Sequence, residues 1–215
     1  MYARAVTFVA VIFLLAGCDG GPKSENAEPP HADWVVTTHV AFLDADRKTP
    51  IAAPVTPMRL WLPYVVGDLY GSPTAGEITP VALAPDLSFT VNLNLGHLRL
   101  ERALVPSEFS QKWMNIEPKE ARVARMLPFV MGAEGITPLG LCEWLDLDTG
   151  TRLMLVYFDR PSRMRGEVVY DGRSLRFDIT ATEAGYLWIR QPDGSGAYTA
   201  VPRPKNLVLA VLPDR

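Results

Sequence analysis

Asp146 and Asp148 are the two side chains in this sequence whose types and spacing could serve acid–base chemistry. They belong to the segment Asp146-Leu-Asp-Thr-Gly-Thr151, which follows a run of apolar residues. Two neighbouring carboxyl groups can act as general acid and general base when one holds its proton and the other has lost it. Asp, Thr and Gly are also the residues that favour a tight turn between two strands. The sequence favours the turn over the acid pair.

Residues 147–151 resemble the Asp-Thr-Gly-Ser/Thr motif of aspartic proteases. That resemblance implies a homodimer, because the protease chemistry needs two aspartates that share one proton and this chain carries one motif. The segment also looks like the Asp-x-Asp-Gly-Thr box of haloacid-dehalogenase-type phosphatases. Thr149 is an extra residue there and displaces the glycine, and the alternating strands and helices of that fold are missing. These differences set the phosphatase resemblance aside. A hydrolase that uses Asp146 and Asp148 in another way stays an alternative.

Cysteine and histidine offer little further chemistry. Cys142 lies among bulky apolar residues with no basic neighbour to activate its thiol, so it is predicted to be a small buried hydrophobe. His31, His39 and His97 lack the spacing of metal ligands. The sequence predicts no metal site and no cofactor.

Charged and aromatic residues give two weaker candidates. Asp159-Arg160-Pro161 and Arg163-x-Arg165 gather charge where a strand is expected to end, which fits an anion site or, more simply, a solvated loop. The tryptophans could form a binding surface, but the apolar strand context of four of them favours core packing; the five are Trp34, Trp61, Trp113, Trp144 and Trp188.

The N-terminal residues have the layout of a secretory signal peptide. Residues 1–4 carry one positive charge, residues 5–16 are apolar, and the small residues Ala16 and Gly17 follow. A transmembrane helix needs about 20 apolar residues, and Asp19 ends this stretch too early.

Leu15-Ala16-Gly17-Cys18 resembles the lipobox of bacterial lipoproteins, and the resemblance covers residues 1 to about 20. It implies that residues 1–17 are removed and that Cys18 becomes the lipidated first residue. Several acyl chains anchor a protein stably where one chain binds only reversibly. The implied location is a membrane of the cell envelope, facing the periplasm. Asp19 favours the inner membrane, as in enteric bacteria, but other bacteria read different positions, so inner versus outer membrane stays open.

Composition limits what the rest of the chain can do. Residues 19–33 hold almost no apolar side chain, so residues 18–33 are predicted to be a lipidated N-terminus and flexible tether. Residues 34–215 are predicted to form a single β-rich globular domain. The formal charge is −3, and no basic run is present, so a nucleic-acid partner is not expected. Lipidation of Cys18 would leave Cys142 without an intrachain partner, which excludes a disulfide framework.

Alternating apolar and polar residues predict a mainly β fold. Strands are expected at 34–43, 58–66, 88–95, 141–147, 152–159, 167–170, 173–180, 186–190, 197–201 and 207–212. Pro57 and Pro63 place the second of these at a sheet edge. Residues 153–158 are apolar on both faces, which predicts a central strand.

The middle of the chain is expected to differ. Short helices are predicted at 107–114 and at 118–127, with loops at 70–76 and 127–139. The second helix would bury a stripe made of Ile116, Ala121, Ala124 and Leu127. The predicted fold is an antiparallel β-sandwich with a short helical insertion, similar in outline to the transthyretin-like sandwiches of periplasmic lipoproteins.

The function that these observations favour is a non-enzymatic lipoprotein, held in the membrane by its N-terminal lipid, that binds a protein partner in the cell envelope. Two alternatives stay open. One is the envelope hydrolase built on Asp146 and Asp148. The other is a sandwich that binds a small ligand in its mouth.

Overall fold

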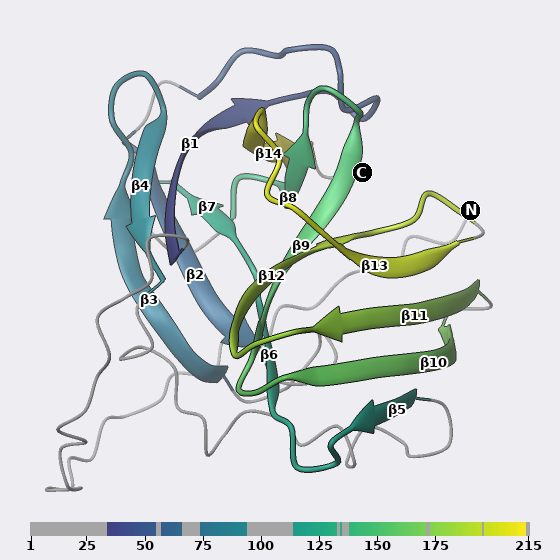
Figure 1. The fold of residues 1–215 in the computed structure, drawn as a ribbon. Coiled ribbons are helices and arrows are strands. Elements are labelled where there is room, and N and C mark those ends of the chain that lie inside the picture. The colour runs from purple at the N-terminus through teal and green to yellow at the C-terminus, as the bar shows by residue number, and fades with distance from the viewer. Residues whose placement is uncertain are drawn as a thin grey trace, which may run out of the picture.

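The described part of the chain is built from β-strands. The computed structural model describes residues 34–54, 57–65, 74–93, 114–132, 134, 138–170, 173–194 and 196–213. These residues form fourteen strands and no α-helix, which confirms the mainly β prediction (Figure 1). The strands are β1 Val35–Phe42, β2 Arg59–Val65, β3 Thr74–Ala82, β4 Ser88–Asn92, β5 Met114–Glu117, β6 Val123–Met126, β7 Phe129–Met131, β8 Leu141–Asp146, β9 Thr151–Phe158, β10 Ser162–Tyr170, β11 Arg173–Ala181, β12 Gly185–Arg190, β13 Ala197–Val201 and β14 Leu207–Leu212.

Backbone pairing joins all of these strands. The main path runs β4-β1-β14-β8-β9-β12-β13-β11-β10-β5, and a branch leads from β9 through β6 to β2, which also pairs with β3 and β7. Most neighbours are antiparallel, but β1 runs parallel to β14, and β11 runs parallel to β13. The predicted antiparallel pairing is therefore present for most neighbours, but the two parallel pairs make the sheet mixed.

Strand β9 lies at the fork of this network. One of its edges pairs with β12 from Leu153 to Phe158. Along the other edge, its first residues pair with β8 and its last residues pair with β6. Residues 153–158 are all buried, so the predicted central strand is confirmed. Two packed faces explain why this strand is continuously apolar.

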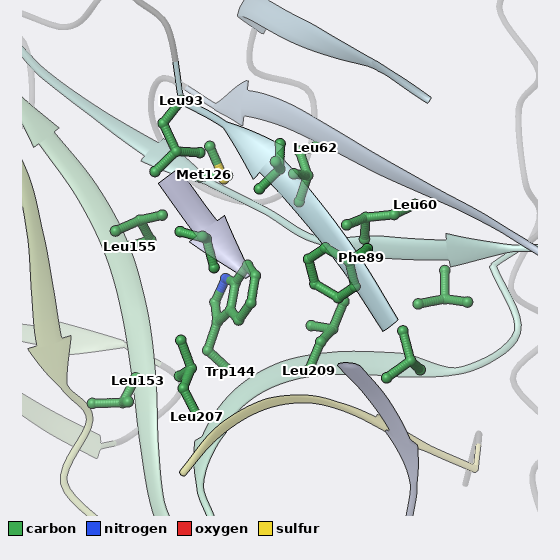
Figure 2. Close-up of a cluster of buried hydrophobic side chains, with 14 of the residues drawn as sticks. Leu60, Leu62, Phe89, Leu93, Met126, Trp144, Leu153, Leu155, Leu207 and Leu209 are labelled. Carbon is green, nitrogen blue, oxygen red and sulfur yellow. The ribbon is translucent and has the colours of Figure 1, made fainter. Parts of the chain in front are cut away.

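The larger core lies on one face of β9. It takes side chains from β1, β2, β4, β6, β7, β8, β12 and β14 as well as β9. Figure 2 shows the indole of Trp144 reaching into this cluster beside Phe89. Trp188 packs on the same indole edge to face, with ring centroids 5.4 Å apart. Fully burying a Leu side chain contributes about 1.5–3 kcal/mol, so Leu60, Leu62 and Leu209 add strongly to stability.

A second core lies on the opposite face of β9. Leu153, Leu155 and Tyr157 point into the larger core, whereas Met154, Val156 and Phe158 point into the second. Strands β5, β10 and β11 supply much of the second core, through Ile116, Met164, Ile179 and Ala181. Figure 1 shows these three strands side by side, next to β13. The period-two alternation of a strand thus separates two hydrophobic layers.

The helix predicted at 118–127 was wrong, and no helix is seen among the described residues. Residues 123–126 form β6, which pairs with β9 on one edge and with β2 on the other. Those pairings satisfy the backbone hydrogen bonds that a helix would have made internally, so tertiary pairing overrides local propensity. The predicted stripe is divided between cores, with Ala121 in the second and Ala124 in the larger one. Of the other predicted helix, residues 107–113 lie outside the described residues, and Met114 begins β5.

The edge position predicted for β2 was also wrong. β2 pairs with β3 on one side and with β6 and β7 on the other. Pro63 is tolerated because it faces the break between β6 and β7, where its carbonyl accepts from the Leu127 N–H at 3.0 Å. The loops predicted at 70–76 and 127–139 contain residues of β3 and the whole of β7, respectively.

The C-terminal half matches the sequence-based expectations more closely. The hairpins β8–β9, β10–β11 and β12–β13 all form, and β14 is the last strand. Ile179 faces inward as expected, with Leu175 and Phe177 half-buried. β14 is buried at every position because it lies between β1 and β8 and has apolar neighbours on both faces. The predicted inward face of β4 is confirmed at Phe89 and Val91; Leu95 lies outside the described residues.

Candidate functional site

The Asp-Thr-Gly segment forms the turn between β8 and β9. Gly150 has φ of +69°, a backbone conformation that favours glycine, and its N–H donates to the Asp146 carbonyl at 2.8 Å. The Asp146 carboxylate accepts from the Asp148 N–H at 3.2 Å and from the Thr149 hydroxyl at 2.7 Å. The turn predicted from the sequence is therefore present, and Asp146 holds it together as an Asx-type cap.

Asp148 makes a different contact. Its carboxylate accepts from the side-chain amide of Asn206, which precedes β14, and the Leu147 N–H donates to the Asn206 carbonyl at 3.0 Å. Each of the two carboxylates therefore accepts a hydrogen bond from a donor in a turn or loop. Asp148 is exposed, and Asp146 is half-buried. A proton shared between two carboxylates depends on desolvated like charges, whereas Asp148 is exposed to solvent.

The charged residues after β9 form ion pairs at Arg160 and Arg165, and Arg163 is exposed on β10. Asp159 accepts from the Arg122 N–H at 2.7 Å and forms an ion pair of 2.9 Å with Arg160. The hydrogen bond and charge of Asp159 raise the pKa of the Arg160 guanidinium. Arg165 pairs across the strands with Asp178 at 2.9 Å, where both side chains are more than half exposed. The Asp159–Arg160 pair lies in the loop after β9, and the Arg165–Asp178 pair connects β10 to β11. Both arginines are exposed, as expected for a solvated region.

Cys142 is half-buried and lies at the start of β8. Its thiol accepts from the Val130 N–H at 3.3 Å and donates to the Gly140 carbonyl at 3.7 Å. It packs against the larger core, so the prediction of a small hydrophobe holds in part. His39 is exposed on β1. Cys18, His31, His97 and Trp113 lie outside the described residues.

The other four tryptophans lie where hydrophobic packing places them. Trp144 and Trp188 are buried in the larger core, and Trp34 packs against it. Trp61 is half-buried on the opposite face of β2, 5.4 Å from the Phe129 ring between centroids. Core packing is therefore confirmed for Trp144 and Trp188.

A network of ion pairs on the outer face of the sheet was not foreseen. Glu143 on β8 accepts from the Arg47 Nε at 2.8 Å and lies 3.9 Å from an Arg152 guanidinium nitrogen. Arg152 continues the network to Asp193 at 3.1 Å. Register places Glu143 opposite Ala210, so the network lies beside a small apolar cluster of Leu43, Leu145, Val208, Ala210 and Leu212. Four separate segments meet there, which no local pattern reveals.

Arg125 on β6 is the second unforeseen residue. Its Nε atom is buried and has no hydrogen-bond partner among the described residues. Burial lowers the pKa of its guanidinium, and the neighbouring Tyr198 partly offsets that effect. Arg125 was not singled out from the sequence, because residues 118–127 were predicted to form a helix whose buried stripe does not include it. Strand alternation, with Ala124 and Met126 facing the larger core, would have placed Arg125 on the opposite face.

No family model, curated protein or solved structure was found to match this chain. Within the described ranges, no three His, Cys, Asp or Glu side chains gather as a metal site would require. The same part of the chain contains no helix of the length and hydropathy needed to cross a membrane.

Proposed function

We propose that this chain is a lipid-anchored protein of a bacterial cell envelope whose β domain binds a protein partner without catalysing a reaction. The observation that carries the proposal is Leu15-Ala16-Gly17-Cys18 at the end of an apolar stretch. On this proposal residues 1–17 are removed, Cys18 carries the lipid, and residues 18–33 hold residues 34–215 away from the membrane surface. The domain then faces the periplasm, and the aspartate after Cys18 favours the inner membrane.

The strands around the larger core are proposed to form a β-sandwich of transthyretin-like outline. Support comes from the packing of β1, β8, β9 and β14 against side chains of β2 and β7, with which they do not pair, in one cluster. Interdigitated side chains between two layers of strands are typical of a sandwich. A rigid β framework of this kind suits a binding module, since its connecting loops can carry the contacts.

The hydrolase alternative has less support. Asp146 holds the β8–β9 turn, and Asp148 binds Asn206, so both carboxylates have structural partners. If the alternative were correct, Asp148→Asn would remove a hydrolytic activity of the wild-type protein and leave its fold intact. The small-ligand alternative has a specific observation in its favour, the buried Nε atom of Arg125, which has no hydrogen-bond partner among the described residues.

Metabolic labelling with a palmitate analogue tests the anchor. Wild-type protein expressed in a bacterium is expected to incorporate the label and to fractionate with membranes washed in high salt. Cys18→Ser is expected to lose the label, because the thiol that forms the thioether is gone. Cys142→Ser is the matched control, and it is expected to keep both the label and the membrane location. Equal labelling of Cys18→Ser and the wild type would refute the lipobox assignment.

Site-specific photo-crosslinking tests the partner. Leu141 on β8 and Val169 on β10 are large exposed hydrophobic side chains, 54% and 67% accessible, on different parts of the sheet. A crosslinker at either position is expected to give one repeatable protein adduct in intact cells, whereas a crosslinker at exposed Thr180 on β11 serves as the control. The same pattern of weak adducts at all three positions would count against a specific protein partner.

A further inference from the structure

The side chain of Arg125 extends on the face of β6 that looks toward the second core. Ala124 and Met126, its chain neighbours, belong to the larger core, so strand alternation turns Arg125 the other way. Across the β6–β9 pairing its Cα partner is Val156, which belongs to the second core. A permanently charged side chain thus lies against a hydrophobic layer.

No acidic side chain in the described part of the chain forms an ion pair with the guanidinium of Arg125. Its Nε is buried without a hydrogen-bond partner among the described residues. Burying an ionised group is costly unless it is paired and hydrogen-bonded, and arginine cannot escape the cost by losing its proton. Among the arginines that form described ion pairs, Arg47 and Arg152 have the least exposed side chains, and both contact Glu143. Arg125 differs from them because it combines burial with an unused donor.

Apolar and aromatic side chains of the second core lie on the face of the sheet toward which Arg125 points. Tyr198 acts electrostatically on the guanidinium, and its ring stacks on Phe177 with centroids 4.7 Å apart and planes 14° apart. Both rings are half-buried and pack against the second core, as does Leu187. In low-dielectric surroundings a charge-assisted hydrogen bond is stronger than in water, and guanidinium groups bind carboxylates in a bidentate fork.

We propose that Arg125, with Tyr198 and Phe177 beside it, forms a binding site for a small organic carboxylate. The guanidinium binds the carboxylate, and the aromatic and aliphatic side chains contact the apolar body of the ligand. An organic carboxylate fits better than phosphate, because phosphate brings a larger charge and no apolar surface to cover Phe177 and Leu187. The proposed site does not depend on the lipid anchor, so its test can succeed or fail independently of the proposed function.

Titration of the full-length protein in detergent with benzoate tests the site, with inorganic phosphate and chloride at equal ionic strength as comparisons. Benzoate is expected to bind saturably in calorimetry and to raise the melting temperature of the wild type. Arg125→Met is expected to lose at least tenfold in benzoate affinity. Arg165→Gln is the control, because Arg165 is an exposed arginine paired with Asp178, and it is expected to bind like the wild type.

The ligand-free melting temperature separates a binding site from a structural arginine. Arg125→Met is expected to melt at or above the wild-type temperature, because an uncompensated buried charge has been replaced by an apolar side chain. Arg125→Lys keeps the charge but loses the fork, and it is expected to fold while binding benzoate at least tenfold more weakly. It therefore serves as the second variant if Arg125→Met does not fold.

Three results would overturn the proposal. The first is equal benzoate affinity in the wild type and a folded Arg125 variant, or no saturable binding to the wild type. The second is a lower ligand-free melting temperature in both Arg125 variants without any effect of benzoate, which would show that the guanidinium has a partner within the chain. The third is stabilisation by phosphate as large as that by benzoate, which would refute selectivity for an organic carboxylate.

Discussion

Single residues in this protein are explained best where a polar group has a local partner. A turn was predicted at residues 148–150, and the Asp146 carboxylate accepts from Asp148 and Thr149 as turn chemistry requires. Arg125 and Glu143 were not predicted, because their roles depend on segments far away in the chain. The tyrosine that acts electrostatically on Arg125 comes from β13, and the arginines that contact Glu143 come from a loop and from β9. Local sequence determines a turn but does not name a distant partner.

Asp46 is expected to titrate at unusually low pH. Hydrogen bonds from the Thr49 hydroxyl and from the Thr49 and Lys48 N–H groups lower the pKa of its carboxyl from 3.8 to about 2. A lowered folded-state pKa means that Asp46 stabilises the fold above pH 3.8 and loses this contribution as the pH falls toward 2. An NMR titration of the carboxyl carbon measures this pKa directly.

The Asp46 titration has an internal comparison. Thr49→Val removes the hydroxyl donor, which makes the largest contribution to the shift, so the pKa of Asp46 is expected to rise toward 3.8 in that variant. An ordinary pKa for Asp46 in the wild-type protein would contradict the hydrogen-bonded turn at residues 44–49.

Gly140 is expected to tolerate no side chain. A Cβ atom there would lie 2.1 Å from the Leu212 carbonyl oxygen, and a backbone atom in a paired strand cannot move aside cheaply. Gly140→Ala is predicted to lower the free energy of unfolding by roughly 1–3 kcal/mol, as measured by urea denaturation. Gly132→Ala is the control, because its Cβ would meet its nearest atom, in Leu139, at an ordinary 3.5 Å. Equal stability of the two variants would show that β8 and β14 are not packed as described.

At the scale of elements, strands with strong alternation were predicted and strands without it were missed. β4, β9 and β14 have clear apolar faces or continuous apolar runs, and each was expected. β3 was not, because Gly76 and Pro80 interrupt it and no alternation marks it. β6 looked helical because it is short and follows Pro118 and Glu120, which are typical of a helix start. Its strand conformation comes from β2 and β9 on its two sides.

The ion pairs that connect strands and loops are expected to differ in how much they stabilise the fold. Glu143 is only 12% exposed and contacts both Arg47 and Arg152. Its loss leaves the partly buried Arg47 without its carboxylate and leaves Arg152 with Asp193 alone. Glu143→Gln is predicted to lower the free energy of unfolding by about 1–3 kcal/mol in urea denaturation. Asp178→Asn removes a pair that is more than half exposed on both sides, so its effect is expected within about 1 kcal/mol. A larger effect at Asp178 than at Glu143 would contradict this ranking.

At the scale of the whole molecule, the mainly β composition was predictable and the mixed pairing was not. β1 and β14 come from opposite ends of the described chain and run parallel, and β11 and β13 run parallel with β12 between them in sequence. Turn residues predict adjacent hairpins, but they carry no information on which distant strands pair. The two cores on opposite faces of β9 were not predictable either, because they contain residues that are far apart in the sequence.

The mass of the mature N-terminal peptide tests whether Cys18 carries the lipid on which the proposed function depends. Full-length wild-type protein is expressed in a bacterium, extracted from membranes and digested, and the N-terminal peptide is measured by mass spectrometry. We expect a peptide that begins at Cys18 and carries the mass of attached acyl chains. An N-terminal peptide with an unmodified Cys18, or a mature chain that begins at another residue, would contradict it.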